Sequence, residues 1–187
     1  MKRIAFWSLG LAVVSLTVFS GCMRPLKEGH EVATGPGGTF TVLQPITLPE
    51  GGHGLGAYGN FALGDISDPY NLAPVGFKSG LAMSFRAELD EKKVPTDTSR
   101  RTALVNVVVL YYEDATLVGQ AFGPQEEVVA RVELVDKGTK KVLGVANCVG
   151  RTSTTLMQGV NKKAEGLAKG ITAWIEKNRP KKEGKQE

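Results

Sequence analysis

Apolar residues recur at helical spacing in two stretches of the chain. In the first, every fourth residue from position 77 to 89 is Phe or Leu and charged residues fall off that stripe, which predicts an amphipathic helix over about Val75–Lys92. The second stripe is formed by Leu156, Val160, Ala164, Leu167, Ile171, Trp174 and Ile175. Thr152 or Ser153 is placed to cap this helix. Three glycines within it, each costing about 0.8–1 kcal/mol relative to Ala, mean that it needs tertiary packing.

Alternation of apolar and polar residues predicts strands elsewhere. The stretch Thr39–Leu48 alternates, and Pro45 restricts it to an edge or bent strand. Residues Thr102–Tyr112 are apolar on both faces apart from Asn106, which is typical of a central strand.

A hairpin is predicted next. Residues Val128–Val135 alternate, Asp136–Thr139 forms a turn in which Gly138 is free to take a positive φ, and Lys140–Gly150 returns as the partner strand. One face of the returning strand carries only the small residues Gly144, Ala146, Cys148 and Gly150. Such a face suits the close approach of a helix.

The order of these elements predicts the fold class. We expect an α/β (α+β) domain of two layers over residues 39–178, with a mixed or antiparallel sheet of about four strands and two helices packed on one face. Between the first strand and the first helix lies Gly51–Pro74, a glycine-rich segment that reads as a long irregular loop. Because it also carries many apolar groups, it either folds over the core or forms part of an interface.

The N-terminus has the pattern of a secretory signal peptide. A basic start is followed by the apolar run Ile4–Val18 and by Phe19-Ser20-Gly21-Cys22. The run is shorter than the roughly 20 residues that span a bilayer. The cysteine after Ser-Gly resembles the bacterial lipobox, with Phe19 in place of the usual Leu. The resemblance implies that the thiol of Cys22 carries a diacylglycerol thioether and that its freed amine is acylated. The alternative is an ordinary signal peptide cut elsewhere.

The lipobox resemblance also implies a location and a domain order. Met23 stands where an Asp would favour retention in the inner membrane, which points to the outer membrane with the mature chain facing the periplasm. Residues 1–21 are then the signal peptide, 22–38 a flexible tether and 179–187 a basic disordered tail. Loss of Lys2 and Arg3 lowers the net charge from +4 to +2, and an exported chain of low charge argues against a nucleic-acid partner.

Few residues point to catalysis, cofactors or metals. His30 and His53 are too remote from each other to form a zinc site, and Cys148, in an apolar strand, is expected to be a buried, inert thiol. Gly54–Gly59 matches the dinucleotide fingerprint, but no helix is predicted to open at its last glycine. The turn around Asp68-Pro69 fits no calcium-binding loop. We therefore expect no enzyme, no cofactor and no metal.

The C-terminal part resembles a known group of proteins. Its features are the strand 128–136, the return 142–146, Gly150 and the Ala- and Gly-rich helix segment 164–171. From Ala103 to Trp174 the chain is similar to bacterial envelope lipoproteins that share a domain of unknown function. The same order of elements occurs in accessory lipoproteins of secretion and transport machines, including the curli secretion channel type. This resemblance implies the fold and the location but no active site.

The leading hypothesis is a non-enzymatic binding or scaffold module of a cell-envelope assembly, whose partner is another envelope protein or a second copy of the chain. The candidate contact residues are Leu55, Tyr58, Phe61, Tyr70 and Leu72. They can instead simply cover one face of the sheet. An apolar-walled pocket would favour a carrier of lipid or another small apolar ligand, and convergent polar groups in a cleft would favour an envelope hydrolase.

Overall fold

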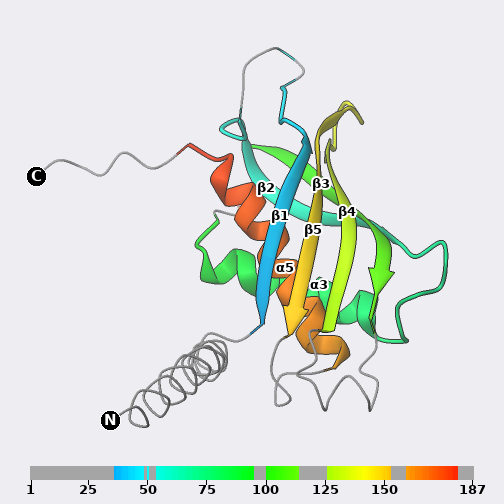
Figure 1. Cartoon of the computed structure of the whole chain (residues 1–187). Helices are drawn as coiled ribbons and strands as arrows, with labels where there is room; N and C mark the ends of the chain where they lie inside the picture. Colours follow the sequence, from blue (N-terminus) through cyan, green and yellow to red (C-terminus); the bar gives the residue numbers. More distant parts are fainter. Residues whose placement is uncertain are drawn as a thin grey trace, which may run out of the picture.

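The domain is built on one five-stranded sheet. The computed structural model describes residues 36–48, 50, 54–94, 100–113, 126–152 and 159–180. The strands are β1 (Gly37–Gln44), β2 (Tyr58–Ser67), β3 (Arg101–Tyr112), β4 (Glu126–Asp136) and β5 (Val142–Thr152), and the helices are α3 (Phe77–Glu91) and α5 (Val160–Lys177). The strand order is β1-β5-β4-β3-β2 (Figure 1). Only the β2–β3 pair is parallel, so the sheet is mixed.

The two helices form a second layer on one face of the sheet. α5 packs across β1, β5 and β4, and α3 lies against α5 on the side of β2 (Figure 1). The predicted two-layer fold is confirmed, as is the edge position of β1, and β3 is an interior strand that is paired on both sides. The sheet has one strand more than expected, because β2 lies inside Gly51–Pro74. Register shifts and two glycines in β2 break the alternation that would have marked it as a strand.

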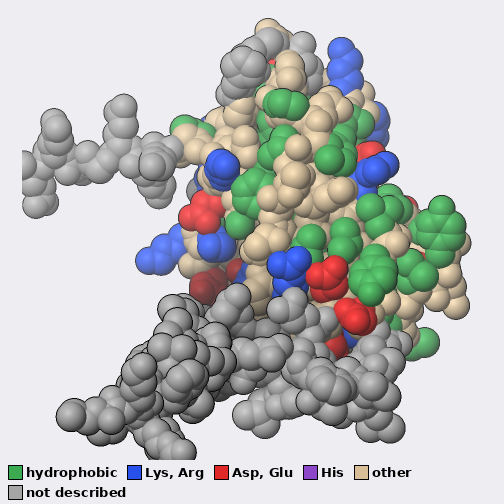
Figure 2. Space-filling model, viewed as in Figure 1, with side chains coloured by type: hydrophobic (Ala, Val, Ile, Leu, Met, Phe, Trp, Pro, Cys, Tyr) green, Lys and Arg blue, Asp and Glu red, His purple; other side chains and the backbone are tan. Residues whose placement is uncertain are grey.

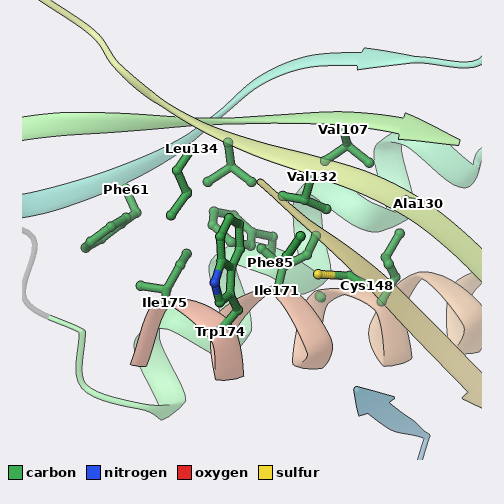
Figure 3. Close-up of a cluster of buried hydrophobic side chains, with 14 of the residues drawn as sticks. Phe61, Phe85, Val107, Ala130, Val132, Leu134, Cys148, Ile171, Trp174 and Ile175 are labelled. Carbon is green, nitrogen blue, oxygen red and sulfur yellow. The ribbon is translucent and has the colours of Figure 1, made fainter. Parts of the chain in front are cut away.

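The core lies between the sheet and the helices. The indole of Trp174 rises from α5 among Phe85, Ile171 and the valines of the sheet (Figure 3). Cys148 points from β5 into the same layer, is fully buried, and has a pKa raised to about 12 by that burial. The predicted burial of this thiol is therefore confirmed, while its inertness stays a prediction.

Glycines bring α5 unusually close to the sheet. A Cβ on Gly38 of β1 or on Gly150 of β5 would collide with the backbone of α5 near Gly166. The predicted approach of a helix to the small face of the hairpin is thus confirmed at Gly150. Gly144 is an exception, since a Cβ there would meet Ile46 rather than the helix.

Several expected details differ in the structure. Thr152 cannot cap the last helix, because it pairs with Glu126 at the end of β5. α5 begins instead after Gly159, and Ser153 lies outside the described residues. In the hairpin turn Lys140, not Gly138, takes the positive φ, of 60°. The carboxylate of Asp136 accepts from the Thr139 N–H at 2.6 Å, and this contact shapes the turn.

The fold moves one boundary of the predicted terminal segments, because Gly37 and Gly38, the last two residues of the predicted tether 22–38, belong to β1. Cys22 and the rest of residues 1–35 lie outside the described part of the chain, as do residues 181–187. Neither of the described helices is long and apolar enough to cross a membrane.

Candidate binding site

β2 is an edge strand. Among the described residues it pairs only with β3, and its other side is unpaired. An edge strand presents backbone N–H and C=O groups that can pair with another chain. Register shifts at Tyr58/Asn60 and Leu63/Ile66 confine the regular part of β2 to Asn60–Leu63. These four residues are therefore the part of the edge that is suited to strand pairing.

A groove runs between this stretch of β2 and α3. Its volume is about 530 Å³. It is lined by Asn60, Phe61, Ala62, Leu63, Ala82, Phe85, Arg86, Leu89 and Asp90. Phe61 and Phe85 are buried and form its floor, whereas Ala82, Arg86 and Asp90 are exposed at its mouth. We call this feature the edge groove.

The helical repeat of α3 places the groove residues. Phe77, Leu81 and Phe85 turn into the core. Ala82, Arg86 and Asp90 are four residues apart, so they share a neighbouring face of the helix. The short side chain of Ala82 keeps the groove open, and Arg86 and Asp90 supply one charge of each sign. The edge groove thus combines an apolar floor with polar groups at the mouth.

The structure separates the five predicted contact residues. Leu55, Tyr58 and Phe61 are buried in the core, as expected if they cover one face of the sheet, and of these only Phe61 reaches the edge groove. Tyr70 and Leu72 are exposed in the loop after β2, where a partner contact stays a prediction.

Tyr58 belongs to a buried polar network at the start of β2. Its hydroxyl donates to Oδ2 of Asp136 at 2.7 Å, and Arg101 donates to the same oxygen at 2.6 and 3.0 Å while lying over the Tyr58 ring. Arg101 also pairs with Glu50. Burial and the hydrogen bond to Asp136 raise the pKa of Tyr58 well above its usual value. Tyr58 therefore anchors β2 to the hairpin.

The chemistry-bearing residues form no recognisable catalytic or metal centre in the described part of the chain. No group of three His, Cys, Asp or Glu side chains there is arranged to hold a metal ion, and His30 and His53 fall outside it. Gly59 lies in β2, so no helix opens at the last glycine of the fingerprint-like sequence. Lys163 of α5 and Glu126 of β4 form a buried ion pair at 3.2 Å.

Comparisons with known proteins give structural similarities only. No family model and no curated protein matches the chain. A PelC dodecamer from Paraburkholderia phytofirmans, solved in two crystal forms, is 16% identical. It aligns over 74% and 73% of this chain and 96% of its own, with TM-scores of 0.45 and 0.43. Lipoprotein GNA1162 from Neisseria meningitidis is 14% identical over 64% of this chain and 96% of its own, with a TM-score of 0.38. These values are too low to transfer an assembly or an activity.

The residues of α3 that line the groove were not predicted as site residues. Their role depends on β2 being a strand and lying at the edge of the sheet. One signal does point to that arrangement: a helix between two strands is the usual connection between parallel neighbours. Recognising β2 as a strand would have placed α3 beside its edge.

Proposed function

We propose that the chain is an outer-membrane lipoprotein, anchored through acylated Cys22, whose domain faces the periplasm and acts as a non-enzymatic binding module of a cell-envelope assembly. The signal-peptide pattern and the Ser-Gly-Cys sequence support the anchor. The edge groove supports the binding role. Its lining contains one carboxylate, Asp90, whereas a glycosidase needs two across the substrate, so a glycoside hydrolase is the weaker hypothesis.

The unpaired stretch Asn60–Leu63 beside the groove is the observation that carries the binding role. We infer that an extended segment of a partner polypeptide adds to β2 as a further strand. Main-chain hydrogen bonds then supply affinity, and a side chain of the partner placed over Phe61 and Phe85 supplies selectivity. Arg86 and Asp90 at the mouth can pair with polar groups of the same segment.

The groove is tested by crosslinking in cells. A photoreactive phenylalanine analogue at Arg86 is expected to crosslink a polypeptide. Ala82→Trp, which fills the groove, should lower that yield about tenfold, equivalent to about 1.4 kcal/mol of binding free energy. Ala87→Trp is the matched control, because Ala87 is also exposed on α3 but does not line the groove. Equal yields from the two tryptophan variants would contradict the proposal.

A carrier of a small apolar ligand is the second candidate. The groove volume falls within the range of small-molecule sites, and Phe61, Leu63, Phe85 and Leu89 give it an apolar lining. Native mass spectrometry of the extracted protein distinguishes the two functions. A carrier would retain a small molecule that is lost in Ala82→Trp, whereas the binding module would crosslink a polypeptide.

The anchor is tested through Cys22→Ser. The native protein is expected to fractionate with membranes and to have the intact mass of a chain that begins at Cys22 and carries acyl groups. The variant should lose the acyl mass and leave the membrane fraction. A native chain without acyl mass would remove the lipoprotein assignment and leave the groove proposal to stand by itself.

A further inference from the structure

The loop between β2 and α3 exposes large apolar side chains. Tyr70 is 73% exposed, Leu72 37% and Val75 103%. We call residues 69–75 the apolar loop. Figure 2 shows hydrophobic side chains gathered toward the right of the view, over the end of β3 and the loop after β2. Clustered apolar exposure of this kind marks a contact surface more often than scattered single residues do.

Hydrogen bonds within the loop hold these side chains outward. The Asp68 carboxylate accepts from the Leu72 N–H at 2.9 Å and from the Ala73 N–H at 2.8 Å. The Asn71 N–H donates to the Asp68 carbonyl at 3.2 Å, with Asn71 at a φ of 53°. The Phe77 N–H then donates to the Pro74 carbonyl at 3.1 Å, where α3 begins. The exposure is therefore a property of a shaped loop, fixed at both ends.

The apolar loop lies at the end of the sheet where the N-terminal segment joins it. β2 runs parallel to β3, so both strands finish at the same end of the sheet. Tyr112 at the end of β3 pairs with Val128 near the start of β4, so β4 begins at the end of the sheet where β3 finishes. Glu127 of β4 pairs with Arg151 of β5, and Arg151 pairs with Gly37 at the start of β1, so β1 begins at the same end (Figure 1). We call this end of the sheet the anchor end.

The chain between Cys22 and the domain is short. Thirteen residues lie between Cys22 and Pro36, the first described residue, so fourteen residue-to-residue steps join the two. Even fully extended, that length spans at most about 50 Å. An acylated Cys22 therefore keeps the anchor end within this distance of the bilayer and makes it the end most directly tied to the membrane.

We propose that the apolar loop contacts the lipid surface that holds Cys22, with Tyr70, Leu72 and Val75 entering the headgroup boundary. This inference rests on the proposed lipid anchor. A tyrosine with its ring in the apolar boundary and its hydroxyl in water suits that depth. Lys78, which lines the same surface hollow as Val75, supplies a cation for lipid phosphates. The domain is then held to the membrane at two points, the acylated Cys22 and the apolar loop. Two points of attachment fix the orientation of the domain on the membrane, whereas the acyl chains alone would leave it free to turn.

The test uses the full acylated protein in vesicles of phosphatidylethanolamine and phosphatidylglycerol, with and without brominated acyl chains. Val75→Trp places a fluorophore in the apolar loop. Val142→Trp is the matched control, because Val142 is 44% exposed at the start of β5, the opposite end of the sheet. Trp174 is buried and common to both variants. We expect bromine to quench the added Val75→Trp fluorescence about twofold and to leave Val142→Trp unchanged, because an apolar face at the membrane surface is buried about 5–10 Å into the boundary between headgroups and acyl chains.

Flotation of the protein with the same vesicles tests the Cys22 anchor separately from the lipid contact of the apolar loop. Protein that floats with Val75→Trp quenched supports both. Protein that floats with Val75→Trp unquenched overturns the lipid contact and leaves the anchor standing. A blue-shifted Val75→Trp emission without quenching shows that a protein surface covers the loop, which also overturns the proposal. Protein that fails to float overturns the anchor, and the lipid contact with it.

Discussion

Gly38→Ala is expected to lower the free energy of unfolding by about 3 kcal/mol, as overpacking at a closed backbone contact does. A Cβ at position 38 would collide with the Gly166 carbonyl oxygen and the Gly170 N–H nitrogen of α5. Both are backbone atoms of one helix, so no side-chain rotation relieves the clash. β1 must move away from α5, which also strains its pairing with β5. Urea unfolding of the two proteins measures the difference.

The neighbouring residue provides the control. A Cβ on Gly37 would meet no atom within 4 Å. Gly37→Ala should therefore leave the free energy of unfolding unchanged or raise it by up to about 1 kcal/mol, because alanine restricts the unfolded chain. If Gly38→Ala and Gly37→Ala were equally stable, the close backbone contact between β1 and α5 at Gly38 would be contradicted.

The contact of α5 with β5 and β1 was predicted from the sequence only in part. The glycines of the last helix predicted that the helix needs close packing, and the small face of the returning strand predicted that the helix packs there. Both predictions follow from the size and the spacing of residues within one element. The contribution of Gly38 was not predicted, because β1 joins β5 across more than a hundred residues of sequence. Nothing local to Gly38 indicates that α5 passes over it.

The edge groove was harder to predict for a related reason. Phe61 and its neighbours were recognised as apolar residues of interest, but their segment was read as a loop. A strand with Gly59 and Gly64 and two register shifts loses the regular alternation on which such a prediction depends. Without β2 the sheet has no edge beside α3, and Ala82, Arg86 and Asp90 remain ordinary exposed positions on a helix.

The polar network at Asp136 was also not predicted from the sequence. Asp136 was identified as a turn residue, which the hydrogen bond from Thr139 bears out. Its contacts with Tyr58 and Arg101 join three strands, and each partner looks unremarkable alone. Burial acts to raise the pKa of Asp136, but hydrogen bonds from Tyr58, Thr139 and Arg101 outweigh it and hold the pKa well below its usual value. The carboxylate form is therefore built into the fold.

Asp136→Asn is expected to lower the free energy of unfolding by about 2 kcal/mol at pH 7. The amide keeps the size of the side chain but removes the charge that faces Arg101, and loss of one partner of a buried pair is costly. We place the loss below that of a fully enclosed pair, because Arg101 is partly exposed and water screens it. Urea unfolding at a series of pH values gives the comparison.

The pH dependence identifies the cause of that loss. Asp136 has a lower pKa in the folded than in the unfolded chain, so the unfolded chain binds its proton more readily. Its contribution is complete above about pH 5, where an unfolded Asp, with a pKa of about 3.9, is almost fully ionised, and it declines as the pH falls through that pKa. The native protein should therefore lose stability on acidification and approach Asp136→Asn, with the difference narrowing from about pH 5 downward. Asp65→Asn, at an exposed position in β2, should follow the native protein within about 0.5 kcal/mol. A deficit for Asp136→Asn that stayed constant between pH 7 and pH 3 would show that shape, and not the charge of Asp136, stabilises the junction of β2, β3 and β4.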